Sequence, residues 1–130
     1  MPHILIDYSA NLDPQIDMGG LCFALKDAAA ATGVFPPAGI RVRAHRADHW
    51  VIADGVARHG FVDITLRLAA GRSAAQKTCA VEAVFAAAQD YTAAYMAAHP
   101  FMLSLELREI DAVFSRKVSS IRDYLPPEMH

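Results

Sequence analysis

Residues 61–76, FVDITLRLAAGRSAAQ, contain the pattern that decides the fold, because a strand leads directly into a helix there. Phe61 to Leu68 alternates between its two faces and is rich in β-forming residues, which predicts a strand. Gly71-Arg72-Ser73 then predicts a turn, and Ser73 and Gln76 have the spacing of a capping box. The segment therefore predicts a strand followed by a capped helix.

The order strand, helix, strand occurs twice along the chain. The predicted helix runs from Ala74 to about Ala98, ends at His99-Pro100, and is followed by a strand from Phe101 to Arg108. The first half gives the same order, with these expected elements: a strand from His3 to Ser9, a helix from about Asp17 to Thr32 with Gly33 at its C-cap, and a strand from Ile40 toward His45. Trp50-Val51-Ile52 is expected to extend the sheet briefly.

A helix of this length between two strands requires a parallel crossover. The sequence therefore predicts an α+β fold in which two β-α-β units form one four-stranded mixed sheet, with both helices on one face. A ferredoxin-like domain has the same element order and is the alternative fold. One domain is expected over residues 1–130, with residues 111–130 as a less regular C-terminal arm.

The composition favours an oligomer. Hydrophobic residues make up 54% of the chain and charged residues 20%, which is more apolar surface than a compact monomer of 130 residues easily hides. The second face of the sheet is expected to be apolar in part, since Leu5 faces away from Ile4 and Ile6. We expect this face to pack against other subunits.

Charge and cysteine usage exclude several classes of function. The net charge is −2 and no basic stripe is present, so no nucleic-acid partner is expected. Charges interrupt the longest apolar runs and no signal-like segment opens the sequence, which predicts a cytoplasmic protein without membrane attachment. Cys22 and Cys79 are predicted to be reduced, packed thiols. His45, Asp48, His49 and His59 lack a recognised zinc spacing, so no metal site is expected.

Pro2 is the most informative candidate for chemistry. If Met1 is removed, the Pro2 nitrogen changes from an inert tertiary amide to a basic secondary amine. Its ring and the buried strand that follows would hold the lone pair in one direction, as a general base requires. The alternative is that a small second residue only permits removal of the methionine.

Arginines provide candidate binding sites for an anion near Pro2. Arg41, Arg43 and His45 alternate along the second strand and share one face. Arg72 precedes a helix start, where free backbone N–H groups already favour an anion and a guanidinium can clamp a carboxylate. Solvent exposure is the alternative for each, Arg43 above all. Trp50 is a further candidate for lining a ligand site, with core packing as its alternative.

Several blocks together resemble a known family: Pro2-His3, Ala31-Thr32-Gly33-Val34-Phe35-Pro36, Ala38-Gly39-Ile40-Arg41, Ala53-Asp54-Gly55, Phe61-Val62 and Gly71-Arg72-Ser73. They are similar to the 5-carboxymethyl-2-hydroxymuconate isomerases of the tautomerase superfamily, over most of the chain from Pro2 to about Arg108. The segment Arg46 to His49 and the tail beyond Asp111 fit this resemblance poorly.

The resemblance implies a homotrimer with active sites near the subunit boundaries and a reaction that needs no cofactor. Pro2 would carry a proton within an unsaturated carboxylate substrate, and Arg41 and Arg72 would bind its carboxylates and stabilise the developing charge. Arg43, His45 and Trp50 are the further substrate-binding candidates. Two alternatives stay open at this point: another tautomerase reaction on a smaller enol acid, and a non-catalytic ferredoxin-like ligand-binding module.

Overall fold

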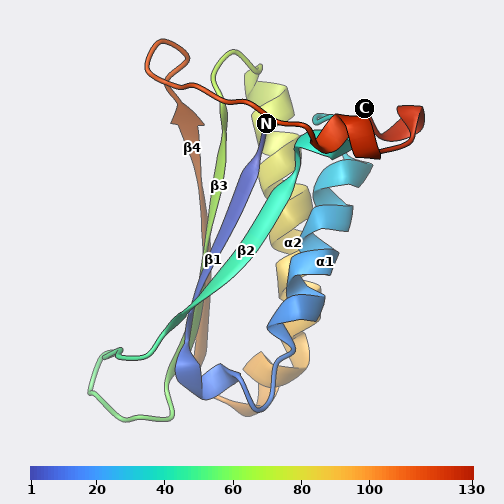
Figure 1. Ribbon diagram of the computed structural model, residues 1–130. Coiled ribbons are helices and arrows are strands. Elements are labelled where there is room, and N and C mark those ends of the chain that lie inside the picture. Colours follow the sequence, from blue (N-terminus) through green and yellow to red (C-terminus); the bar gives the residue numbers. More distant parts are fainter.

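The sheet has the strand order β2-β1-β3-β4, and both long helices cover the same face of it (Figure 1). The computed structural model describes residues 1–130. Its helices and strands are β1 (His3–Ser9), α1 (Met18–Ala31), β2 (Arg41–Ala47), β3 (Gly60–Ala69), α2 (Ala74–Ala98) and β4 (Phe101–Ile110), with short 3-10 turns at Ala10–Leu12, Pro37–Gly39, Ile121–Tyr124 and Pro127–Met129. The predicted α+β fold with two β-α-β units is confirmed.

Strand pairing separates the two folds that the element order allowed. β1 pairs with β2 in parallel, β3 pairs with β4 in parallel, and β1 and β3 join the two units as antiparallel neighbours. In a ferredoxin-like domain, another strand is inserted between the two strands that a helix connects. Here each helix connects adjacent strands, so the ferredoxin-like alternative is wrong.

The start of α2 shows why the second β-α-β unit could be predicted from its sequence. The backbone N–H of Gln76 donates to Ser73 Oγ at 3.1 Å, and the Ser73 N–H donates to Gln76 Oε1 at 3.0 Å. This capping box satisfies two backbone donors that the first turn leaves free. The predicted bounds of α2, Ala74 to Ala98, are confirmed.

The two helices approach closely at Gly20. A Cβ at this position would collide with the Tyr91 hydroxyl, which donates to the Asp17 carbonyl at 2.7 Å. Asp17 is also the N-cap residue of α1, one residue before the observed helix. Glycine therefore allows α2 to lie against the first turn of α1.

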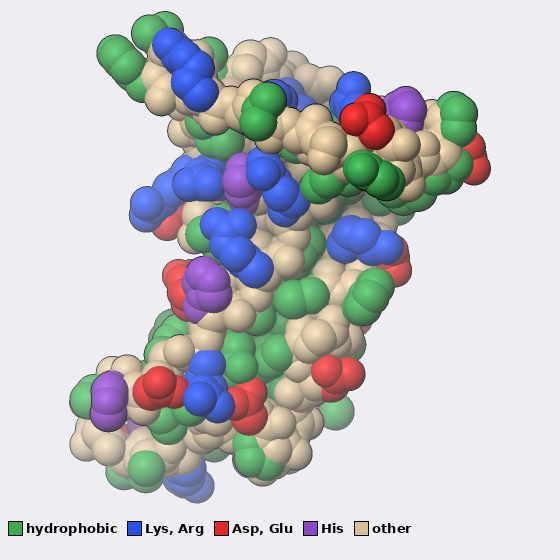
Figure 2. Space-filling view, viewed as in Figure 1, with side chains coloured by type: hydrophobic (Ala, Val, Ile, Leu, Met, Phe, Trp, Pro, Cys, Tyr) green, Lys and Arg blue, Asp and Glu red, His purple; other side chains and the backbone are tan.

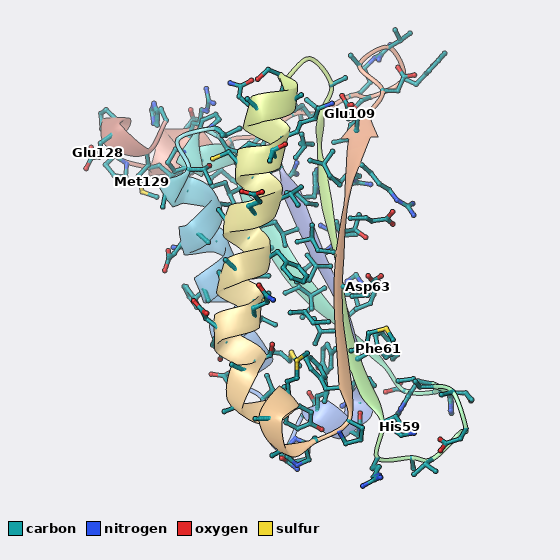
Figure 3. All side chains as sticks on the ribbon, turned by 180° about the vertical axis from the view of Figure 1, so that it is seen from behind. His59, Phe61, Asp63, Glu109, Glu128 and Met129 are labelled. Carbon is teal, nitrogen blue, oxygen red and sulfur yellow. The ribbon has the colours of Figure 1, made fainter.

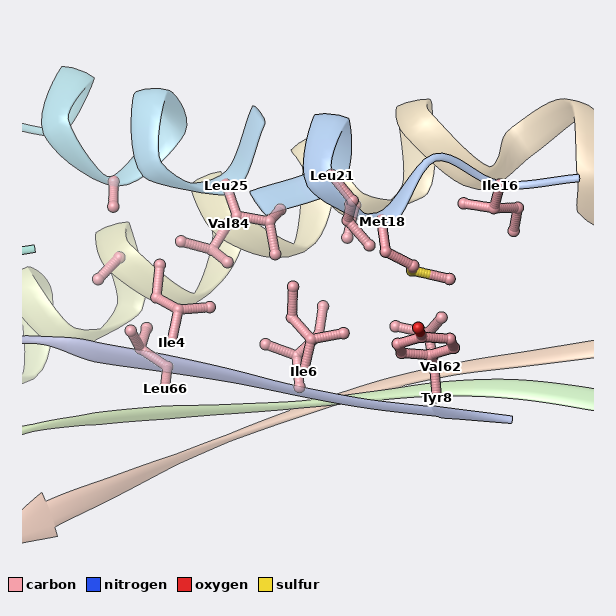
Figure 4. Close-up of a cluster of buried hydrophobic side chains, with 14 of the residues drawn as sticks. Ile4, Ile6, Tyr8, Ile16, Met18, Leu21, Leu25, Val62, Leu66 and Val84 are labelled. Carbon is pink, nitrogen blue, oxygen red and sulfur yellow. The ribbon is translucent and has the colours of Figure 1, made fainter. Parts of the chain in front are cut away.

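The core lies between the helices and one face of the sheet. Every second residue of β3 from Val62 to Leu68 is fully buried, and so are Ile4 and, almost completely, Ile6 of β1. Leu21 and Leu25 of α1 and Val84 of α2 meet these strand residues from above (Figure 4). This alternation is the period of two that a half-covered sheet requires.

The opposite face of the sheet, here called the open face, has no helix over it (Figure 1). Asp63 lies on this face and Glu109 on the helix side (Figure 3). Leu5, Phe61 and Met102 are apolar positions on the open face, as expected for part of it. The register forms two polar rows across the open face: a basic row of Arg41, His3, Arg67 and Arg108, and an acidic row of His45, Asp7, Asp63 and Ser104.

Two local predictions are wrong. Trp50-Val51-Ile52 does not extend the sheet, because β2 ends at Ala47 and the chain then turns into a loop in which the Val51 side chain is exposed. Cys79 is not packed: it lies on the exposed side of α2, whereas Cys22 is half-buried, and both thiols are free. Burial raises the pKa of the Cys22 thiol.

None of the helices has the length and apolar character needed to cross a membrane.

Residues 111–130 follow β4 as an arm, hereafter the C-terminal arm. The arm leaves the end of β4, passes the amino terminus, and reaches the end of α1 that lies near Pro37–Gly39 (Figure 1). Its apolar side chains are exposed, among them Val113, Phe114, Val118 and Tyr124. The arm thus brings distant parts of the sequence to the amino-terminal end of the sheet.

Candidate active site

A cavity of about 780 Å³ lies at the amino-terminal end of β1, between the open face and the C-terminal arm. Its lining includes Met1, then His3, Arg41 and Arg67 from the strands, and residues 110–112 and 114–118 from the end of β4 and the arm. Lys and Arg side chains gather around a histidine just below the arm (Figure 2). The fold therefore places basic side chains from three strands and the arm around one hollow.

The charges that line the cavity are unbalanced. The cationic side chains are Arg41, Arg67, Arg116 and Lys117, and none of them forms an ion pair with a carboxylate. The single acidic residue in the lining is Asp111, whose carboxylate accepts hydrogen bonds from the backbone N–H groups of Val113 and Phe114. Such an excess of positive charge favours an anionic ligand.

Pro2 is buried between the cavity and the core. Its carbonyl accepts a hydrogen bond from the Arg41 N–H at 3.1 Å, which ties the residue to the start of β2. Met1 covers it and packs against Gly39, where a Cβ would lie 3.1 Å from Met1 Cγ. Because Met1 itself lines the cavity, its removal would leave the Pro2 nitrogen at the cavity wall.

The environment of the amino terminus disfavours a protonated amine. Burial lowers the pKa of the Met1 amine, and the positive charges of Lys117, Arg72 and Arg41 lower it further. A Pro2 amine would lie one residue deeper along the same chain, so it would experience the same two effects. The site is therefore suited to a neutral amine, the form that can accept a proton.

His3 lies between two arginines. Arg41 Nη2 is 2.8 Å from His3 Nε2, and Arg43 Nη1 is 3.4 Å from His3 Nδ1. Burial, followed by the charges of Arg41, Arg67, Arg43 and the amino terminus, lowers the pKa of His3 to about 4. A neutral imidazole has one acceptor nitrogen, so it can accept from Arg41 or Arg43 but not from both.

Arg72 is close enough for its charge to act on the amino terminus, but it does not line the cavity. Its guanidinium lies over the Phe35 ring, 4.8 Å from the centroid, and donates to the Ala69 carbonyl at 3.2 Å. The structure therefore brings Arg41 and Arg72 to the same end of the fold, with Arg41 at the cavity and Arg72 behind it.

The other candidates from the sequence lie outside the cavity of this chain. Arg43 lies two residues beyond Arg41 on β2, opposite Leu5, and contacts His3 from the side, and His45 lies in the acidic row beside Asp7. Trp50 is at the opposite end of the sheet, where its Nε1 donates to the His59 carbonyl at 2.9 Å. Within one chain, His45 and Trp50 do not join Pro2.

The sequence interpretation did not include His3, Arg67 or Lys117 among the site residues. The alternation of β3 already placed Arg67 on the face opposite Leu66, but only the register sets it beside His3. Lys117 follows β4 by seven positions in an irregular segment, and no periodicity indicates where such a segment lies. To predict these site residues, one needs the pairing register of β1 with β3 and the path of the arm.

No group of three or more His, Cys, Asp or Glu side chains is arranged to hold a metal ion. The histidine at the far loop, His59, is instead paired with Asp54, with 2.7 Å between Nε2 and Oδ1.

The paired β-α-β units, with the strand order β2-β1-β3-β4 and both helices on one face, define a protein of the tautomerase fold class. Structures far apart in sequence share this fold, among them a fused 4-OT described as a symmetric trimer, 18% identical with a TM-score of 0.63 over 91% of this chain and 92% of that chain.

The sequence itself places the chain more narrowly. The profile of the family described as 5-carboxymethyl-2-hydroxymuconate isomerase matches residues 2–125, and the chain belongs to this family. The 5-carboxymethyl-2-hydroxymuconate Delta-isomerase of Escherichia coli is 36% identical over 121 residues, which cover 93% of this chain and 96% of the relative.

Two solved structures with related names are also close. A 5-carboxymethyl-2-hydroxymuconate delta-isomerase superposes with a TM-score of 0.89 and 32% identity, covering 95% of this chain and 92% of that chain. The 5-carboxymethyl-2-hydroxymuconate isomerase from Deinococcus radiodurans R1 gives a TM-score of 0.88 and 33% identity, covering 96% of this chain and 95% of that chain. The similarity thus includes the arm up to residue 125 as well as the sheet.

Proposed function

We propose that the protein is an isomerase that needs no cofactor and moves a proton within 5-carboxymethyl-2-hydroxymuconate or a closely similar unsaturated acid. Membership of the isomerase family supports the reaction type. The observation that carries the proposal is the buried Pro2 beside a cavity with four unpaired cationic side chains and one acidic residue. An aromatic-acid degradation route in the cytoplasm is the setting in which we expect this substrate.

Pro2 is the proposed proton carrier, and it acts only after Met1 has been removed. Its neutral nitrogen takes a proton from one end of the conjugated system and returns it to the other end. An α-amino group ordinarily titrates near pH 8. Burial, followed by the charges of Lys117, Arg72 and Arg41, lowers the pKa of the amino terminus and so favours the neutral form that the base requires.

Arg41 is the proposed partner of the substrate's carboxylate and of the negative charge that forms during the transfer. Its guanidinium lines the cavity and its orientation is fixed by the hydrogen bond to His3. Donors that are already oriented toward a developing oxyanion stabilise the transition state without reorganisation. Arg72 contributes from behind by its charge, and Arg43 has the smaller part of a second contact to His3.

A homotrimer is the proposed assembly. The open face is uncovered in one chain, and large apolar side chains are exposed on the arm and elsewhere, including Phe114, Val118 and Phe23. Burial of such surface between identical chains is the usual outcome for a soluble protein. Light scattering at micromolar concentration should give about three chains per particle, and a stable monomer would contradict this assignment.

The test of function is a spectrophotometric assay of protein whose Met1 removal has been confirmed by intact mass. The panel contains 5-carboxymethyl-2-hydroxymuconate, 2-hydroxymuconate and phenylenolpyruvate, which differ in the number of carboxylates. We expect the first to give the highest kcat/KM. Highest turnover of the monocarboxylate would instead favour the alternative, a tautomerase of smaller enol acids.

A further inference from the structure

Arg67 is a cationic side chain of the cavity that the proposed mechanism leaves without a role. It lies on β3, opposite His3 in the register and near the C-terminal end of that strand. Its guanidinium has no carboxylate partner, and its Nε is buried without any hydrogen-bond partner. A buried donor without a partner costs free energy, and a bound carboxylate would remove this cost.

The neighbour of Arg67 in the basic row, which lies outside the cavity, does have a carboxylate partner. Arg108 on β4 pairs with Arg67 in the register, but its Nη2 is 2.8 Å from Glu106 Oε1 and its side chain is 65% exposed. Arg108 does not line the cavity. Two arginines in adjacent register positions therefore differ in their surroundings: Arg108 is exposed and paired with a protein carboxylate, whereas Arg67 lines the cavity without one.

Position then indicates which part of a ligand Arg67 would contact. Arg41 and Arg67 flank His3 on its two sides, so their strands are two sheet spacings apart, about 10 Å. Pro2 comes directly before His3, where β1, the strand between these two arginines, begins. A substrate that reacts at Pro2 would thus extend toward Arg41 on one side and toward Arg67 on the other.

We propose that Arg67 forms a second carboxylate subsite, which binds the carboxymethyl branch of the substrate while Arg41 binds the part on which negative charge develops. This inference rests on the proposed function. The guanidinium presents several donors in one plane and can hold a carboxylate through two parallel hydrogen bonds. Arg67 is therefore the residue that distinguishes a tricarboxylate from the same dienol without the branch.

The test compares kcat/KM for 5-carboxymethyl-2-hydroxymuconate and for 2-hydroxymuconate, which lacks the branch, in protein freed of Met1. Arg67→Met should lower the value for the branched substrate by about 10- to 100-fold, the scale for losing a charge-assisted hydrogen bond. The value for 2-hydroxymuconate should fall by a much smaller factor. Arg67→Lys should recover part of the preference, because it keeps the charge but loses the planar fork.

Arg108→Met is the matched control, since it removes an arginine from the same row outside the cavity, and it should leave the preference unchanged. Light scattering and circular dichroism should show that each variant keeps its assembly and fold. If Arg67→Met lowers both substrates equally, or if Arg108→Met changes the preference as much, the subsite is wrong. If Arg67→Met fails to fold, Arg67→Lys becomes the test. An unchanged preference for the branched substrate in Arg67→Lys would then contradict the subsite.

Calorimetric binding of tricarballylate and glutarate, which differ by one carboxylate branch, gives the same comparison without turnover. The wild-type protein should bind tricarballylate more tightly than glutarate, and Arg67→Met should abolish this difference in affinity. Loss of this difference in a protein that isomerises neither muconate would overturn the proposed function and keep the subsite. Activity on both muconates with no effect of Arg67→Met in either assay would overturn the subsite alone.

Discussion

The basic and acidic rows lie on the same open face of the same sheet but differ in charge. The basic row contains Arg41, His3, Arg67 and Arg108, and the acidic row, four residues further along β1, contains His45, Asp7, Asp63 and Ser104. Four residues of strand separate them by about 13 Å. In the acidic row Ser104 Oγ donates to Asp63 Oδ1 at 2.7 Å, so a protein donor already serves that carboxylate. No protein carboxylate pairs with the arginines of the basic row that line the cavity. The end of the sheet that carries this row is therefore the one suited to bind an anion.

The largest expected effect comes from the nitrogen of Pro2 itself. Protein that retains Met1 should be nearly inactive, because an amide nitrogen has no basic lone pair. Pro2→Ala with Met1 removed keeps a terminal amine but loses the rigid ring, and kcat/KM should fall by about 10²–10⁴-fold, the scale of general acid–base catalysis. Steady-state kinetics on samples of known intact mass measure both effects.

Full activity of homogeneous protein with Met1 attached would contradict the assignment of the active site to the basic row. The catalytic base would then have to be another group on the sheet or its loops. His45, Asp63 and the loop residue His49 would be the groups to test next. Light scattering should show that the Pro2→Ala chain keeps its assembly, so that lost activity is assigned to chemistry and not to unfolding.

Arg41→Ala is expected to have the next largest effect. It removes the guanidinium that lines the cavity and contacts His3, and kcat/KM should fall by about 10²–10³-fold, the scale for losing one oriented donor in a water-poor site. Arg43→Ala, on the same strand and face but outside the cavity, is the matched control and should cost much less. Equal losses in the two variants would show that the contribution is not confined to the cavity wall.

The pH dependence of kcat/KM tests whether the positive charge of the basic end acts on the amine. Lys117 is the residue to change, because among the charged groups it lowers the pKa of the amino terminus most. Lys117→Met should raise the pKa of the Pro2 amine, since a protonated amine no longer faces that charge. The acidic limb of kcat/KM against pH should then move to higher pH. Lys77→Met, which removes a lysine paired with Glu109 on the helix side, should leave the limb in place.

The smallest expected effect concerns His3 and the stability of the fold. The pKa of His3 is lowered to about 4 in the folded chain from 6.5, so the unfolded chain binds the proton more readily in between. The stability that neutral His3 provides is complete above pH 6.5 and is lost as the pH falls toward 4. Urea midpoints at fixed protein concentration should therefore fall less steeply over this window in His3→Gln, and identical slopes in both proteins would contradict the assigned environment.

The second β-α-β unit could be predicted almost to the residue because its signals are local. The capping box at Ser73 and Gln76 and the stop at His99-Pro100 each depend on atoms a few positions apart. Trp50-Val51-Ile52 was misjudged for the opposite reason. Strand propensity describes a residue that fits a half-buried surface, and no neighbouring strand extends to these residues.

The candidate site was predictable in part. Arg41, which strand alternation placed on the open face, lines the cavity, and Pro2 is buried next to Met1, which also lines it. Arg72 was expected to present its guanidinium to an anion, but the Phe35 ring and the Ala69 carbonyl hold it behind the cavity. Phe35 belongs to the loop after α1, so this contact depends on how the first unit meets the second.

The sequence by itself determined the two β-α-β units, the residues of the buried face and the position of a potential amine base, because these follow from periodicity, capping and chain order. Only the tertiary structure decided that Arg41, His3 and Arg67 form one row and that the arm brings Lys117 over it. The physical reason is that antiparallel pairing of β1 with β3 and the return of the arm join residues more than sixty positions apart. No local pattern encodes the register that makes these charges neighbours.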